Sequence, residues 1–108
     1  YMKKVAANLK KYNCKMYYLS VNPVNSAMIK SVGGKARSEA QIASFNRTIY
    51  KNLCSGKNKS FTYINSCTNL QMKGWISNRH DMGIYDGLHY SNATYLRIFD
   101  YCMRYLNR

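Results

Sequence analysis

The sequence predicts an α/β fold, and more narrowly the C-terminal part of a doubly wound domain with a parallel sheet. Two observations predict it. Helical and strand-like patterns alternate along the 108 residues, as in chains whose parallel strands are joined by crossover helices. Only two segments are strand-like, which is too few for an independent sheet of this kind, because parallel strands are normally buried inside larger arrays. We therefore expect residues 1–108 to be one part of a single domain.

The first helix and the first strand are predicted at residues 2–12 and 16–21. Apolar residues recur at helical spacing up to a break at Asn13, namely Met2, Val5, Leu9 and Tyr12. The run MYYLSV is rich in aromatic and β-branched residues and is typical of a buried strand. Pro23 ends it, because proline cannot continue a central ladder, and we expect residues 26–37 to form a loop.

Ser38 is the expected N-cap of the second helix, with Glu39 at the positive end of its dipole. The apolar stripe of this helix is Ile42, Phe45, Ile49 and Leu53. Gly56 lies where a C-terminal cap is expected. SFTYIN at 60–65 predicts the second strand, and we expect residues 66–85 to be irregular.

A last helix is predicted after Ser91, whose hydroxyl is a typical N-cap. Its expected apolar stripe is Tyr95, Phe99, Cys102 or Met103, and Leu106.

The chain is strongly basic, with 17 Lys and Arg against four Asp and Glu and a formal net charge of +13. Such a charge attracts polyanions such as nucleic acid, anionic lipid or wall polymers. The basic residues are scattered, which favours a solvated basic surface over a dedicated nucleic-acid site. No apolar run is long enough to span a bilayer, and residues 1–10 do not resemble a signal peptide. Because Tyr1 precedes Met2, we expect the N-terminus to arise by processing or by a cut.

The four cysteines show no spacing typical of a zinc site, and two histidines are too few for a metal cluster. We therefore expect no metal. Cys14 and Cys102 are interpreted as buried free thiols. Cys54 and Cys67 are candidates for a disulfide, which the sequence neither requires nor excludes.

The most distinctive pair of residues is Asp86 and His89, in the segment IYDGLHYS just before the last helix. A carboxylate that accepts the Nδ1 proton of a histidine leaves Nε2 free as a general base. Gly87 between them allows a tight turn. In open α/β sheets such groups gather at the carboxyl ends of strands. The structural alternative is a capped turn with a surface histidine.

The segment DGLHYSNATYLRIFDYCMRYL resembles the C-terminal block of the SGNH (GDSL-type) serine hydrolases, where Asp-x-x-His directly precedes the last helix. MYYLSVNPVN is similar to a strand and proline-containing loop of that family. EAQIASFNRTIYKNL is similar to its next helix, and FTYIN to its last strand. The resemblance covers nearly the whole chain and implies a flavodoxin-like, three-layer parallel-sheet domain.

This resemblance implies that Asp86 orients and His89 acts as the general base of a Ser-His-Asp triad. The family's Gly-Asp-Ser and Gly-x-Asn-Asp blocks, which supply the nucleophile and oxyanion hole, do not occur in the sequence. We therefore expect the chain alone to be inactive, and its partner to be a missing N-terminal segment or a second copy. The expected substrate is an acyl ester, such as an acylated carbohydrate or lipid, with no cofactor. We expect an extracellular or cell-surface bacterial protein, whose positive charge would suit an anionic polysaccharide or cell-wall substrate.

Asn22, Pro23 and Asn25 follow a strand and are predicted to line the substrate cleft, with a plain turn as the equal alternative. His80 is interpreted as a loop histidine. Trp75 and Tyr85 are interpreted as packing residues rather than substrate contacts.

Two other functions remain open at this stage. One is a small basic secreted protein that binds nucleic acid, in outline similar to a ribonuclease, because many lysines, two histidines and four cysteines occur in a short chain. Its aromatic residues, however, fall in core stripes rather than on a stacking face. The other is a non-catalytic module in which Asp86 and His89 have only a structural role.

Overall fold

The protein is a mixed α/β chain, seen here in a computed structural model that describes residues 1–35, 38–57, 59–72 and 87–107. These residues form five α-helices, one π-helical turn and two strands. In chain order they are α1 (Met2–Lys10), β1 (Tyr17–Leu19), α2 (Ser26–Ser31), α3 (Glu39–Ile49), the π-helical turn η1 (Tyr50–Cys54), β2 (Thr62–Ile64), α4 (Ser66–Met72) and α5 (Asn92–Leu106). Among the described residues, none of the helices is long and apolar enough to cross a bilayer.

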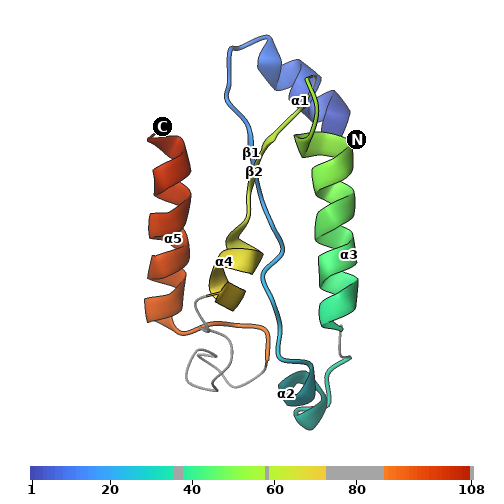
Figure 1. The fold of residues 1–108 in the computed structure, drawn as a ribbon, viewed down its shortest axis with the longest axis vertical. Coiled ribbons are helices and arrows are strands. Elements are labelled where there is room, and N and C mark those ends of the chain that lie inside the picture. The colour runs from blue at the N-terminus through green and yellow to red at the C-terminus, as the bar shows by residue number, and fades with distance from the viewer. Residues whose placement is uncertain (36–37, 58, 73–86, 108) are drawn as a thin grey trace.

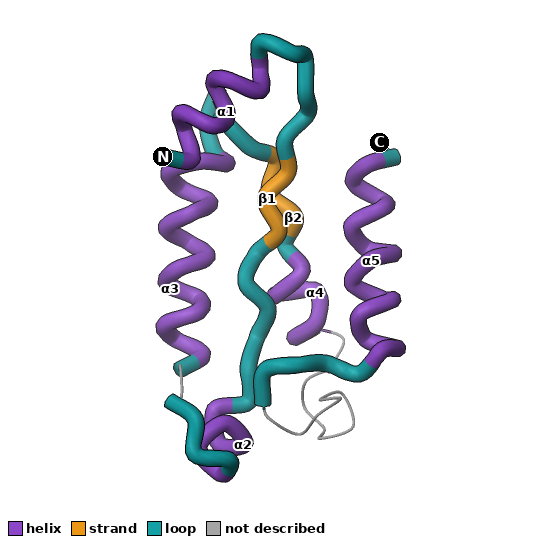
Figure 2. The backbone as a smooth tube through the Cα atoms, turned by 180° about the vertical axis from the view of Figure 1, so that it is seen from behind, coloured by secondary structure: helices purple, strands orange, loops and turns teal. Residues whose placement is uncertain are grey.

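The two strands pair in parallel, with Tyr17 opposite Thr62 and Leu19 opposite Ile64. Figure 1 shows both strands running from the α1 end of the molecule towards α2 and α4, while α3 and α5 run back on opposite sides of the strand pair. The view from behind gives the same arrangement (Figure 2). The predicted parallel pair is therefore confirmed, and its carboxyl ends meet between α2, α3 and α4.

Two helix starts and two helix ends follow from local sequence. Ser38 caps α3 in a capping box, because its hydroxyl accepts from the amide of Gln41 at 3.1 Å while the Gln41 side chain accepts from the Ser38 amide at 2.9 Å. Ser91 caps α5 by accepting from the amide of Thr94 at 3.3 Å. Asn13 and Gly56 adopt positive φ just after α1 and η1, so both breaks occur where the sequence predicts them.

Two segments expected to be irregular are partly helical. Residues 26–31 form α2, because the side chain of Asn25 accepts from the amide of Met28 at 3.0 Å and caps the helix. Residues 66–72 form α4, and the side chain of Asn65 accepts from the amide of Thr68 at 3.2 Å. Residues 73–85 of the predicted loop lie outside the described residues. Both helices begin at an asparagine side chain that accepts a backbone hydrogen bond, and neither was predicted from apolar periodicity.

The buried residues of the described ranges form three clusters rather than one core. One joins α2, α4 and α5 through Met28, Leu70, Tyr90 and Ile98. A second joins α1, η1 and the start of β2 through Ala6, Leu53, Cys54 and Phe61. The third joins the loop after β1 to α2, α3 and α4 through Val24, Ile29, Ile42 and Cys67. The third cluster lies at the carboxyl ends of the strands and holds the loops of the candidate site.

Several predicted core residues are exposed instead. In α5 the buried residues are Thr94 and Ile98, whereas Tyr95 is 42% and Phe99 is 58% exposed. Leu106 is half exposed as well, whereas Cys102 of the predicted stripe packs against the cluster that contains Ile98 and Leu70. The buried face of α5 is therefore only partly the predicted one. Leu9, Tyr12 and Phe45, which were predicted to lie in buried helix stripes, are exposed. Cys14, which was predicted to be a buried thiol, is exposed as well.

Candidate functional site at the carboxyl ends of the strands

Two serines tie the ends of the strands together. The Ser20 hydroxyl, just after β1, accepts from the amide of Cys67 at 2.9 Å. The Ser66 hydroxyl, just after β2, donates to Oδ1 of Asn22 at 2.9 Å. Both serines are almost fully buried. Their hydroxyls therefore hold the two strand ends together.

Asn46 of α3 holds the loop after β1 from the other side. Its Oδ1 accepts from the amide of Val21 and its Nδ2 donates to the carbonyl of Val21, both at 2.9 Å. The buried side chain of Asn46 thus satisfies both the amide and the carbonyl of Val21, as a neighbouring strand would do. The path of residues 21–25 is thereby fixed relative to α3.

The three predicted substrate-binding residues lie in this loop, and each has a structural contact. Asn22 bonds Ser66, and Asn25 caps α2. Pro23 is fully buried, and its carbonyl accepts a hydrogen bond from the hydroxyl of Tyr90. Their predicted contact with substrate stays a prediction.

The segment before α5 is anchored on this same loop at two points. The amide of Asn25 donates to the carbonyl of Gly87 at 2.9 Å, and Tyr90 bonds Pro23. Gly87 has a φ of +81°, and a Cβ there would lie 2.5 Å from the carbonyl oxygen of Asn25. Only glycine fits this close approach. His89 lies between the two anchors and is exposed, next to the carboxyl ends of the strands.

Asp86 lies outside the described residues, so the predicted contact between Asp86 and His89 stays a prediction. The same holds for the interpretations of Trp75, His80 and Tyr85. Within the described ranges, no three His, Cys, Asp or Glu side chains come together as a potential metal site.

All four cysteines are free thiols. Cys54 and Cys67, the two candidates for a disulfide, belong to different core clusters and are not bonded to each other. Burial raises the pKa of the Cys54, Cys67 and Cys102 thiols above the usual value. These thiols are consequently protonated and poorly nucleophilic near neutral pH.

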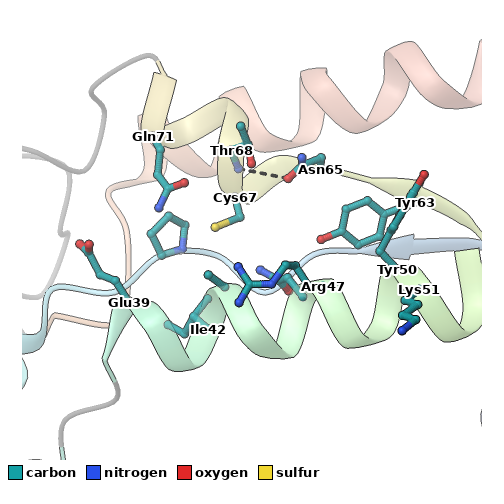
Figure 3. Close-up of a pocket in the computed structure, with 13 residues that line it drawn as sticks. Glu39, Ile42, Arg47, Tyr50, Lys51, Tyr63, Asn65, Cys67, Thr68 and Gln71 are labelled. Carbon is teal, nitrogen blue, oxygen red and sulfur yellow. Dashed lines mark hydrogen bonds between the residues drawn. The ribbon is translucent and has the colours of Figure 1, made fainter. Parts of the chain in front are cut away.

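A groove of about 760 Å³ opens between α3, β2 and α4. Figure 3 shows Arg47 and Ile42 of α3 on one wall and Asn65 and Thr68 on the other, with the sulfur of Cys67 between them. Pro23 also lines it, so the groove shares one residue with the loop after β1, to which Tyr90 is bonded. Sequence reasoning did not reveal this groove. The available signal was the spacing of Arg47 and Lys51, which places two cations on one face of a helix.

Comparison with family models, with curated proteins and with solved structures finds no match to this chain.

Proposed function

We propose that this chain is the C-terminal part of an SGNH-type serine esterase or acyl-transfer domain, and that Asp86 and His89 are two members of its Ser-His-Asp triad. The observation that supports this most directly is the anchoring of residues 87–90 on the loop after β1. Gly87 and Tyr90 hold the backbone on both sides of His89 at the carboxyl ends of parallel strands, the edge of an α/β sheet at which catalytic groups gather.

The proposed chemistry needs a serine from another segment. His89 would take the serine proton at Nε2 as the hydroxyl attacks the ester carbonyl, and would return that proton to the leaving alcohol. Asp86 would accept a hydrogen bond from the Nδ1–H group of His89 and, as a carboxylate, stabilise the imidazolium. The oxyanion hole would come from the blocks that this sequence does not contain, which is why the chain alone is expected to be inactive.

We further propose that the complete domain is three-layered and flavodoxin-like, with more strands than the two in this chain. The amide of Thr62 donates to the carbonyl of Met16, and that of Ser20 to the carbonyl of Ile64. The backbone groups of Tyr17 and Leu19 therefore point away from β2, as the alternation of a parallel ladder requires. A further strand at this edge, supplied by an N-terminal segment or by a second copy, would use them.

The exposed face of α5 supports the same partner. Leu96 and Phe99 are more than half exposed, and the helix runs beside the strand pair (Figure 2). Additional strands beside β1 would widen the sheet beneath the helices, and additional helices would cover this face.

Two observations favour the alternative, a small basic protein that binds nucleic acid. One is the net charge of +13, and the other is the exposure of Tyr12, Tyr95 and Phe99, which the sequence had placed in apolar stripes. The four free thiols are instead what we expect of the hydrolase part, because a small secreted protein of the ribonuclease kind would hold them as disulfides. We therefore give the esterase function precedence.

The test uses the longest natural polypeptide that carries these residues, assayed with p-nitrophenyl acetate. His89→Ala should lower kcat about 1,000-fold or more with little change in KM, because triad members act mainly in the transition state. The matched control is His80→Ala, the only other histidine of the chain, which should keep normal turnover. Equal rates for His89→Ala and the parent protein would remove the pair from catalysis.

A further inference from the structure

The groove between α3 and α4 has the size and the mixed lining of a small-molecule site. Its volume of about 760 Å³ falls within the range that such sites usually span. Ile42, Ala43 and Pro23 give it an apolar middle, and the buried thiol of Cys67 lies on its floor. Polar side chains from β2 and α4 form the opposite rim, namely Tyr63, Asn65, Thr68 and Gln71. A ligand would therefore meet apolar contacts along its middle and hydrogen-bonding groups along one side.

Charge is distributed unevenly along the groove. Glu39 lies at one end, while Arg47 and Lys51 lie towards the other (Figure 3). Arg47 lies eight positions after Glu39 in the helix, which is about 12 Å at the usual rise. No described carboxylate pairs with Arg47. The cationic end therefore suits an anionic group, and the Glu39 end suits a hydrogen-bond donor.

The aromatic residues narrow the ligand further. Tyr50 and Tyr63 pack edge to face, with ring centroids 5.3 Å apart and an interplanar angle of 70°. They form the wall next to Lys51 (Figure 3). A ring seated here would meet aromatic edges and faces. A polyanion such as nucleic acid suits the groove poorly, since its charge would extend over the apolar middle to Glu39.

We propose that this groove binds an elongated organic anion with an apolar or aromatic middle, its carboxylate at Arg47 and Lys51 and its donor end towards Glu39. His89 does not line the groove. The proposal is therefore independent of the esterase function, and either can fail alone.

The test is a titration of the longest natural polypeptide that carries these residues, isotope-labelled, with 4-hydroxyphenylacetate at about 0.15 M salt, which screens nonspecific attraction to a basic protein. We expect saturable shifts at the amides of Arg47, Asn65 and Cys67. Tyramine has the same ring and hydroxyl but carries the opposite charge, and it should bind at least tenfold more weakly. Equal binding of both compounds would overturn the assignment of the cationic end.

Two variants and one control locate the binding. Arg47→Gln should weaken binding about tenfold, since a charge-assisted hydrogen bond is lost. Ala43→Phe keeps every charge but fills the groove, and it should abolish binding. Arg104→Gln removes the same charge from α5, on the opposite side of the strand pair (Figure 1), and should change the affinity less than twofold. Equal losses in Arg47→Gln and Arg104→Gln would reduce the binding to general attraction by net charge.

Discussion

The amide of Asn25 donates a hydrogen bond of 2.9 Å to the carbonyl of Gly87. This bond joins the loop after the first strand to the segment that carries His89, two parts of the chain far apart in the sequence. Tyr90 adds a second link through the carbonyl of Pro23. The position of His89 therefore depends on two contacts that can be removed one at a time.

Gly87→Ala should be strongly destabilising. The new Cβ would lie 2.5 Å from the Asn25 oxygen and 2.7 Å from Ile29 Cγ1, at a positive φ. We expect a loss of about 3 kcal/mol or more in the free energy of unfolding, measured by urea denaturation. Gly33→Ala is the matched control: its φ is +80° with nothing within 4 Å, so only the backbone strain of about 1 kcal/mol remains. Equal losses would show that the close approach at Gly87 does not matter.

Tyr90→Phe should cost about 1–2 kcal/mol of unfolding free energy, because the buried Pro23 carbonyl loses its donor while the ring still fills its place. Tyr12→Phe, at a residue that is 78% exposed, should be neutral. Chemical denaturation of the two variants decides the matter, and a neutral Tyr90→Phe would contradict the anchor.

Asn46→Ala should destabilise the protein by about 2–4 kcal/mol, since both backbone groups of Val21 lose their partner. Asn52→Ala provides the comparison. Its side chain also donates to a backbone carbonyl, that of Thr48 at 2.9 Å, but it is exposed, so we expect a change below about 0.5 kcal/mol. Thermal unfolding of both variants gives the difference between their losses of stability. Equal losses would contradict the role of the Asn46 contacts.

The four thiols should differ in reactivity, and the buried ones should make the protein less stable at alkaline pH. Cys14 is exposed and should react quickly with Ellman's reagent, whereas Cys54, Cys67 and Cys102 should react slowly. Burial raises the pKa of these three thiols in the folded state. The folded protein therefore binds protons more tightly, and this stabilisation, complete below the unfolded thiol pKa of about 8.5, is lost as pH rises through the folded pKa.

Cys14→Ser should remove the fast phase of the reaction and leave the slow phase intact. If the fast phase persists in this variant, another thiol is accessible and the described burial is wrong. Urea midpoints that do not fall above about pH 8.5 would contradict the pKa shifts.

Local signals in the sequence predicted much of the fold. Ser38 and Ser91 marked two helix starts because hydroxyl caps act within one turn. The two strands were predicted in the right places, although they are shorter in the structure. The missed helices α2 and α4 are short and begin after asparagines, where Gly33, Gly34 and the polar residues suggested loops.

What could not be predicted depends on tertiary contacts. Asn46 is polar, yet it is buried because it bonds Val21. Tyr95 was predicted to lie in the core, but its hydroxyl accepts a hydrogen bond from the amide of Tyr90. Its ring packs edge to face on the ring of Tyr90, with centroids 5.8 Å apart. The groove at Arg47 brings together α3 and α4, which sequence periodicity cannot place relative to each other. The Asp86–His89 contact rests on the sequence alone.

The central claim is that Asp86 and His89 serve a serine that this chain does not supply. The most direct measurement is the intact mass, under denaturing conditions, of natural protein that hydrolyses p-nitrophenyl acetate, together with labelling by a serine-reactive fluorophosphonate. We predict no turnover from the 12.6 kDa chain alone, and labelled, active material only when further polypeptide is present. A lone 12.6 kDa species that hydrolyses the ester and carries the label on one of its own serines would contradict the account.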